Sequence, residues 1–400
     1  MQVPSLSFLG FLLVTLVLCL SVGRGSRQAG RKVLALAGVV FTVLGGGWSG
    51  FAVLAAGTAA TAAVLWCLER LDALPRRLAM AMGCLWHIAV LAVCKLTGWM
   101  PLGISFFTFQ QLWLLKEAYT GQYRRSQGDS LLLYTFFFPT VTSGPILRPE
   151  EFFPQLREAF LCPSWGDAAA GLYAISFGMA KKVLLADPLG AVVSNGWALG
   201  QELTAPAAWI VILGYTLRLY LDFSGYCDIA SGCARLLGIR LPVNFDSPYR
   251  ALSVGEFWKR WHITLTSFLR ECVYIPLGGS RRGSVRTYGN ILIVYLISGL
   301  WHGTGWTFLV WGLLHGAAQV TERLWGGRRD ALPKWLRWVM TVFFLNLAWV
   351  FFRAPDISAA AALLKTAVTG GFGGIRPWLV NGLFRREFSA LELLAPAVRP

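Results

Sequence analysis

The stretch that decides the fold is VLALAGVVFTVLGGGWSGFAVLAAGTAATAAVLWC, residues 33–67, which contains no charged residue. Two apolar runs, 33–47 and 50–67, flank its glycine-rich centre. Each run can cross, or nearly cross, a hydrocarbon core about 30 Å thick. Lipid offers backbone amides no hydrogen-bond partner, so we expect both runs to be helices.

The rest of the chain has the same character. Further apolar runs occupy residues 5–22, 78–97, 205–221 and 336–352. Hydrophobic residues make up 56% of the 400 residues and charged residues 14%, whereas soluble domains carry about 25% charged residues. The hydrophobicity is too continuous for the alternating pattern of an outer-membrane barrel. The sequence therefore predicts an all-α polytopic membrane protein.

The net charge of +16 is explained by loops between the apolar runs. Basic residues gather around 21–32, 70–77 and 116–125, while the connections at 45–50 and 97–101 are uncharged. This alternation is the positive-inside pattern, so we expect no nucleic-acid partner. It predicts a multi-pass membrane protein with an extracytoplasmic N-terminus. The first run lacks a preceding basic region, so we expect it to be retained as a span.

Two regions depart from simple spans. Residues 136–156 contain four prolines, which favour an irregular segment covered by protein or lining a cavity. Residues 168–235 place Lys181, Lys182, Arg218, Asp222 and Asp228 within apolar surroundings; such charges are paired or functional. We favour pairing, for example of Arg218 with Asp222 one turn later.

Histidines are the candidate catalytic residues. There are four, and His262, His302 and His315 lie in one stretch. Imidazole titrates near neutral pH and commonly removes a proton from an attacking hydroxyl. His302 lies in GLWHGTGW (299–306), where glycines permit close backbone approach and tryptophans supply flat apolar walls.

Packing explains the same residues equally well. Gly299 with Gly303 and Gly312 with Gly316 form small-x-x-x-small pairs, which pack membrane helices together. His302 and His315 could then be interhelical hydrogen-bonding residues, and His262 an interfacial anchor. Composition alone leaves these alternatives open.

Other chemistries find no support in the sequence. The eight cysteines form no C-x-x-C pair and read as small buried hydrophobic residues. There is no H-E-x-x-H, G-x-S-x-G or P-loop motif. We expect no metal site and no bound cofactor.

Six strings, in one order, resemble the membrane-bound O-acyltransferases, and most closely their bacterial alginate O-acetyltransferase-like branch. The resemblance covers most of residues 100–365. The strings are PLGISFFTFQ (101–110), SGPILRPEEFFPQL (143–156), YLDFSGYCDIASGCARLLGIRLPVNFDSPYR (220–250), FWKRWHITLTSFLRECVYIPLGG (257–279), GLWHGTGWTFLVWGLLHG (299–316) and WVFFRAP (349–355).

The resemblance implies a location in a bacterial inner membrane, a fold and a reaction. The fold would be a ring of about ten to twelve transmembrane and re-entrant helices around a thinned centre, with funnels to both sides. His302 would be the catalytic base, and His262 would occupy the second signature position. An acyl group, here acetyl, would pass from a cytoplasmic thioester (acetyl-CoA or an acyl-carrier protein) toward a polysaccharide hydroxyl outside. An extracytoplasmic serine hydrolase-like acetyltransferase would complete the transfer.

Further residues are candidates for substrate binding or for lining the tunnel. These are Trp261, Trp301, Trp306, His315, Asp222, Ser224, Asp228, Lys259 and Arg260. The basic stretch 259–286 would attract the phosphates of the donor, although membrane topology alone also explains its charge.

We expect a single domain over 1–400, with N-terminal spans in 1–97 and the catalytic core in 100–365. The family usually continues for one or two spans beyond FSALELLAPAVRP (388–400), so we expect either a short member or an incomplete chain. Glu117 and Arg218 stand where the family often has Asp and Gln. Two alternatives remain: D-alanyl transfer to teichoic acid by the sister branch, and a transporter or flippase, for which we find no inverted repeat.

Overall fold

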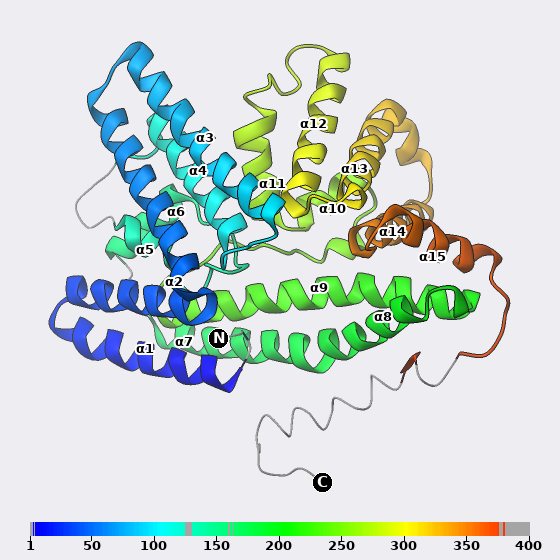
Figure 1. Cartoon of the computed structure of the whole chain (residues 1–400), viewed down its shortest axis with the longest axis horizontal. Coiled ribbons are helices and arrows are strands. Elements are labelled where there is room, and N and C mark those ends of the chain that lie inside the picture. The colour runs from blue at the N-terminus through cyan, green and yellow to red at the C-terminus, as the bar shows by residue number, and fades with distance from the viewer. Residues whose placement is uncertain are drawn as a thin grey trace, which may run out of the picture. The chain divides into compact units, whose positions relative to one another are not determined.

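The structure is a computed structural model that describes residues 3, 5–124, 130–158, 161, 163–375 and 379–380. Within these residues the regular structure is helical (Figure 1). The one β-type pairing among them is an isolated bridge between Phe245 and Trp261. The prediction of an all-α fold is confirmed. The C-terminal string 388–400 lies outside the described residues.

The chain divides into two compact units. Unit 1 contains residues 1–178 and 226–243, and unit 2 contains residues 179–225 and 244–400. The helix α9 (Ala205–Leu236) contributes its first part to unit 2 and its last part to unit 1. The single domain expected over 1–400 stays a prediction.

Unit 1 is built mainly from long apolar helices. Its other elements are α1 (Leu6–Gly25), α2 (Arg27–Arg70), α3 (Ala73–Thr97), α4 (Ile104–Thr120), α5 (Leu131–Thr135), α6 (Pro149–Glu158) and most of α7 (Trp165–Met179). α2 is interrupted at Gly47, whose φ of 73° and ψ of 172° lie outside the helical region. This break separates the two runs predicted at 33–47 and 50–67.

The proline-containing segment of unit 1 is irregular over residues 136–148, which form turns and extended chain. Phe136, Phe137 and Phe138 are fully buried there. The expectation of irregular backbone covered by protein is thus confirmed for 136–148. Residues 149–156, by contrast, belong to the short helix α6.

The described part of unit 2 contains shorter helices, two of which are π-helical. After α7 the chain continues through η1 (Ala180–Ala186, π), α8 (Asp187–Leu199) and η2 (Gly200–Glu202). After α9 come η3 (Pro248–Arg250), α10 (Val254–Arg260), α11 (Ile263–Leu269), η4 (Arg270–Tyr274, π), α12 (Ser284–His302), α13 (Trp306–Trp325), η5 (Gly326–Ala331), α14 (Lys334–Arg353) and α15 (Ile357–Thr369).

Glycines allow α12 and α13 to approach closely. A Cβ atom on Gly299 would lie 2.4 Å from the Phe308 carbonyl oxygen, and one on Gly312 would lie 2.5 Å from that of Tyr295. Both distances are far below van der Waals contact, so neither position accepts a larger residue without separating the helices. This packing holds the end of α12, where His302 lies, against α13.

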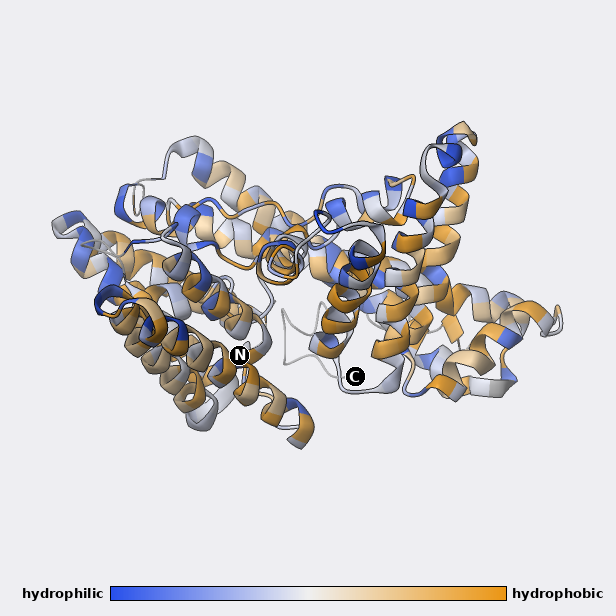
Figure 2. Ribbon diagram, turned by 90° about the horizontal axis from the view of Figure 1, so that it is seen from above, coloured by the Kyte–Doolittle hydropathy of each residue, from blue (hydrophilic) through white to orange (hydrophobic). Residues whose placement is uncertain are grey.

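Among the described residues, five helical stretches are long and apolar enough to cross a membrane. These are α1, α2, α3, the continuous stretch Trp165–Leu199 and α14. Large apolar side chains are exposed on them, such as Leu96 at 79%. Figure 2 shows apolar residues along the helices and polar residues mainly near their ends and in the loops. A multi-pass membrane protein is therefore confirmed, whereas inner-membrane location and N-terminal orientation stay predictions.

The predicted span 205–221 lies within α9, which is not among those five stretches. Arg218 and Asp222 lower the hydropathy of this helix. The ring of ten to twelve helices likewise stays a prediction.

Candidate active site

His262 lies at the junction of α10 and α11 in an unusual backbone conformation. Its φ of 45° and ψ of 54° are left-handed, which costs a non-glycine residue about 1–2 kcal/mol. The segment 244–246 pairs with this junction. The Asp246 N–H donates to the Arg260 carbonyl at 2.9 Å, and the Ile263 N–H donates to the Asn244 carbonyl at 3.0 Å. Such imposed strain is concentrated at functional sites.

The His262 side chain is buried, with 1% exposure. Its Nδ1 lies 3.2 Å from Asn244 Oδ1, and the Phe223 ring packs edge-on with a centroid distance of 4.7 Å. The Trp301 ring lies 6.3 Å away. His262 is therefore a precisely held side chain rather than an exposed interfacial anchor.

His302 is the last residue of α12, because Gly303 leaves the helix with extended backbone. The ring of Phe308 occupies the space beside Gly303, where a Cβ atom would lie 2.2 Å from it. His302 is half-buried within an aromatic wall. Ring centroids of Trp301, Trp311 and Phe352 lie 4.6, 5.2 and 4.9 Å from its imidazole.

The structure brings His262 and His302 together, although they come from different elements. The Trp301 ring lies beside both imidazoles, with centroid distances of 6.3 Å to His262 and 4.6 Å to His302. One imidazole is enclosed and the other is partly accessible. Two histidines beside the same tryptophan, with apolar aromatic walls, can move a proton to or from a hydroxyl while excluding bulk water.

His315 is fully buried on α13. Its Nδ1 accepts a hydrogen bond of 3.1 Å from Trp258 Nε1–H of α10. The rings of Trp311 and Phe344 also lie against it, with centroid distances of 4.9 and 5.2 Å. The geometry matches the interhelical hydrogen-bonding role that the sequence left open for this residue.

The predicted lining residues of α10 to α13 separate into two groups. Trp261 and Trp301 are buried beside His262. Lys259 is exposed, Trp306 is 74% exposed at the start of α13, and Arg260 pairs with Glu256 at 3.0 Å. Only the first group packs around the histidines.

Asp222 forms an ion pair, as predicted, but the prediction that its partner is Arg218 is wrong. Asp222 instead pairs with Lys182 of the π-helical η1. The Lys182 Nζ also lies 3.3 Å from Asp187 Oδ1. Arg218 extends toward α8, where its Nε would lie 2.8 Å from a Cβ atom on Gly190. The extra residue of a π turn shifts which side chains face a neighbouring helix, and η1 thus presents Lys182 to α9.

The remaining acidic and hydroxyl candidates on α9 are divided between the units. Ser224 is buried in unit 2, where its Oγ accepts a 3.5 Å hydrogen bond from Lys181 Nζ. Asp228 belongs to unit 1. Two neighbours of the histidines that sequence reasoning did not single out are Asn244 and Phe352, although both lie inside the strings that carry the family resemblance.

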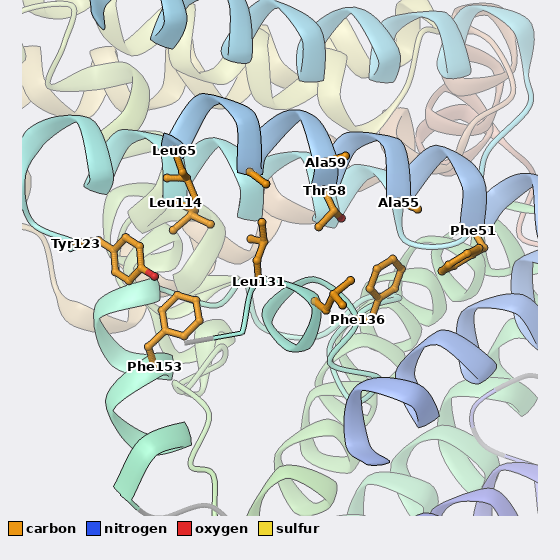
Figure 3. A pocket seen from close by; sticks show the side chains of 12 residues that line it. Phe51, Ala55, Thr58, Ala59, Leu65, Leu114, Tyr123, Leu131, Phe136 and Phe153 are labelled. Carbon is orange, nitrogen blue, oxygen red and sulfur yellow. The ribbon is translucent and has the colours of Figure 1, made fainter. Parts of the chain in front are cut away.

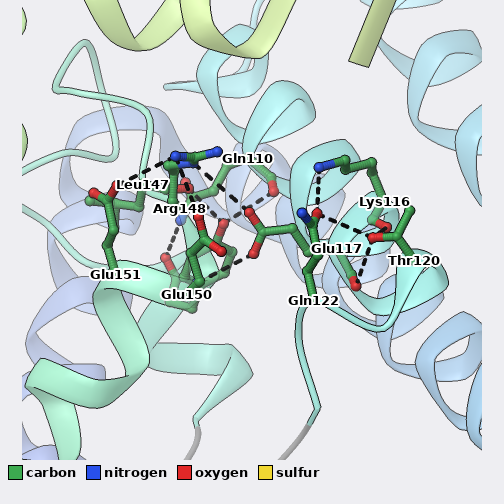
Figure 4. A network of polar contacts seen from close by, with 10 residues as sticks. Gln110, Lys116, Glu117, Thr120, Gln122, Leu147, Arg148, Glu150 and Glu151 are labelled. Carbon is green, nitrogen blue, oxygen red and sulfur yellow. Dashed lines mark hydrogen bonds and ion pairs between the residues drawn. The ribbon is translucent and has the colours of Figure 1, made fainter. Parts of the chain in front are cut away.

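Unit 1 contains a polar network around the fully buried Glu117 (Figure 4). Glu117 Oε2 accepts a 3.3 Å hydrogen bond from the Glu150 N–H, in the first turn of α6. Arg148 lies 4.0 Å from Glu117 and 3.3 Å from Glu150, with its guanidinium 4.9 Å over the Trp113 ring. Burial, together with the charge of Glu150, raises the pKa of Glu117 to about 7.

A cavity of about 320 Å³ also lies in unit 1 (Figure 3). Its walls come from α2, α4, α5 and α6, and they are apolar apart from Thr58 and Tyr123. The Thr58 hydroxyl already donates to the Leu54 carbonyl at 2.7 Å. None of the histidines lines this cavity, so the histidine pair defines the candidate site.

The chain belongs to the membrane-bound O-acyltransferase family, which it matches over residues 80–355. It is 39% identical to the peptidoglycan O-acetyltransferase of Helicobacter pylori over 308 residues, covering 69% of this chain and 58% of the relative. It is 35% identical to the probable alginate O-acetylase of Azotobacter vinelandii over 298 residues, covering 74% and 58%. These relatives confirm the resemblance to the alginate O-acetyltransferase-like branch.

A more distant relative represents the sister branch. The teichoic acid D-alanyltransferase of Bacillus subtilis is 27% identical over 276 residues, covering 63% of this chain and 68% of the relative. The chain spans less than three fifths of the length of these two acetyltransferase relatives.

Proposed function

We propose that this chain is an O-acetyltransferase that transfers acetyl groups from a thioester donor for the O-acetylation of a cell-surface or exported polysaccharide. The observation that carries the proposal is that His262 and His302 both lie beside Trp301, inside the family's matched region. The names of the more similar relatives support acetyl as the group and polysaccharide as the acceptor class.

In this proposal His302 is the base. Its half-buried imidazole removes the proton from the acceptor hydroxyl while the hydroxyl oxygen attacks the thioester carbonyl. A C–O bond forms, the C–S bond breaks, and the proton passes to the departing thiolate. The walls of Trp301, Trp311 and Phe352 limit water, which would otherwise hydrolyse the thioester.

The donor is a substrate, acetyl-CoA or an acyl-carrier protein, on the cytoplasmic side. Exposed Lys259, Arg281, Arg282 and Arg286 would attract its phosphates. The acceptor side is extracytoplasmic, with a serine hydrolase-like acetyltransferase as partner. A ring of ten to twelve helices around a thinned centre would connect the two sides.

The test compares cells expressing wild type and His302→Ala at matched membrane levels. Esters are released from surface polysaccharide with mild base, and the released acid is identified by mass spectrometry. We expect acetate from wild type and its loss in the variant. Full ester content in the variant would contradict the role of His302.

The same measurement separates the alternatives. D-alanine in place of acetate would favour the sister-branch reaction, which the Bacillus subtilis relative makes a second candidate. If the chain were a transporter or flippase, His302→Ala would leave ester formation unchanged and would alter the flux of the transported molecule.

A further inference from the structure

We propose that Asn244 is a positioning residue that holds His262 in the Nδ1–H tautomer, leaving Nε2 to accept a hydrogen bond from the acyl-acceptor hydroxyl. The proposal rests on the proposed function, because it assigns His262 a place in that reaction. It adds a residue and a direction for the His262 hydrogen bond that neither the motifs nor the relatives specify.

The orientation of Asn244 follows from its donors. The Thr264 backbone N–H lies 3.1 Å from Asn244 Oδ1, and a backbone N–H can only donate. The Thr264 hydroxyl lies 2.9 Å from the same atom. The amide atom that faces this junction must therefore be the oxygen. Asn244 is 3% exposed, so bulk water does not compete for these bonds.

The tautomer of His262 follows from the oxygen. His262 Nδ1 lies 3.2 Å from Asn244 Oδ1, which has no hydrogen to donate. Nδ1 must therefore carry the proton and donate it. In a neutral imidazole the other nitrogen, Nε2, then has the lone pair.

The backbone keeps the two side chains in register. Residues 244–246 pair with 260–263 through the Asp246-to-Arg260 and Ile263-to-Asn244 hydrogen bonds and the Phe245–Trp261 bridge. This pairing imposes the left-handed conformation of His262. The pairing fixes the backbone positions of both residues, and the two Thr264 hydrogen bonds hold the Asn244 amide oxygen at this junction.

The tautomer limits what His262 can do in acyl transfer. A neutral imidazole with its lone pair on Nε2 can accept a hydrogen bond from a hydroxyl at that atom. It cannot donate from Nε2 to the oxyanion that develops on the thioester carbonyl. We therefore assign His262 to orienting the acceptor hydroxyl beside His302.

His315 supplies an internal reference. Its Nδ1 accepts the Trp258 Nε1–H, and an indole nitrogen can only donate. A neutral His315 must therefore carry its proton on Nε2. The same chain is thus expected to hold two buried histidines in opposite tautomers.

The experiment is nitrogen NMR on the full chain labelled with ¹⁵N-histidine in lipid nanodiscs at pH 8. With only four histidines, the His262 signals are assigned by their loss in His262→Gln. We expect His262 in the Nδ1–H form and His315 in the Nε2–H form. A wild-type His262 in the Nε2–H form would overturn the proposal.

Three variants complete the test. Asn244→Asp keeps an acceptor oxygen and should retain the tautomer, and Thr264→Val, which leaves the His262–Asn244 bond, should also retain it. Asn244→Leu should produce a mixture and lower kcat for ester formation several-fold, with the KM for the thioester little changed. A pure Nδ1–H signal in Asn244→Leu would overturn the role of Asn244.

The two proposals fail separately. If His262 has the Nε2–H form, the role of Asn244 is disproved, but the ester assay still supports the proposed acetyltransferase. The expected tautomers with full ester formation in both His262→Gln and His302→Ala would contradict the proposed function instead.

Discussion

At the residue scale, the left-handed backbone of His262 is the feature least expected from its residue type. His262→Gly should be more stable than His262→Ala by about 1 kcal/mol, because both remove the ring but only alanine keeps a Cβ in this conformation. The comparison is made by thermal unfolding in detergent. At Thr266, which lies within α11, the same pair should rank in the opposite order, since alanine favours a right-handed helix. Equal rankings at the two positions would show that His262 is unstrained.

Glu117 should give unit 1 a pH-dependent stability. Its folded pKa of about 7 exceeds the ordinary value of 4.5, so between these values the unfolded chain releases a proton that the folded chain retains. The stabilising contribution of the protonated carboxyl is complete below pH 4.5 and is lost as the pH rises to 7.

Glu117→Gln should remove that decline, because a neutral amide can still accept the Glu150 N–H. Apparent melting temperatures between pH 4.5 and pH 8 measure the effect. Glu69→Gln, at an exposed position, is the matched control and should keep the wild-type slope. An unchanged slope in Glu117→Gln would mean that this carboxyl titrates normally.

At the element scale, glycine contacts between α12 and α13 support the position of His302. Gly312→Ala should destabilise the protein by about 1–3 kcal/mol, because the new Cβ would lie 2.5 Å from the Tyr295 carbonyl oxygen. It should also lower ester formation by moving the end of α12. Gly289→Ala, on α12 with nothing within 4 Å, should be neutral or slightly stabilising. Similar effects from both substitutions would rule out close helix packing as the cause.

Elements could be predicted where their signal is local. The glycines at 45–47 predicted a break between two apolar runs, and Gly47 provides it with a positive φ. The prolines of 136–156 predicted irregular backbone, found over 136–148. The π-helical turn η1 has no comparable composition signal. Because this turn could not be foreseen, the sequence predicted Arg218 as the partner of Asp222, whereas the structure has Lys182.

At the scale of the whole molecule, the membrane class was predictable because hydropathy is a property of each run by itself. The histidine pair was predictable in part, since residue chemistry proposed His302 and the family resemblance added His262. Asn244 was not, because its contact with His262 depends on how a loop returns to the α10–α11 junction. No spacing rule in the sequence encodes that return.

The central claim is that His262 and His302 together perform acyl transfer. The most direct test measures polysaccharide ester content for His87→Gln, His262→Gln, His302→Gln and wild type at matched membrane levels. His87 is the control, because it is a buried histidine of unit 1 that hydrogen-bonds Thr61 at 2.9 Å. We predict near-complete loss for His262→Gln and His302→Gln and retention for His87→Gln. Full ester content in either of the first two variants would contradict the account.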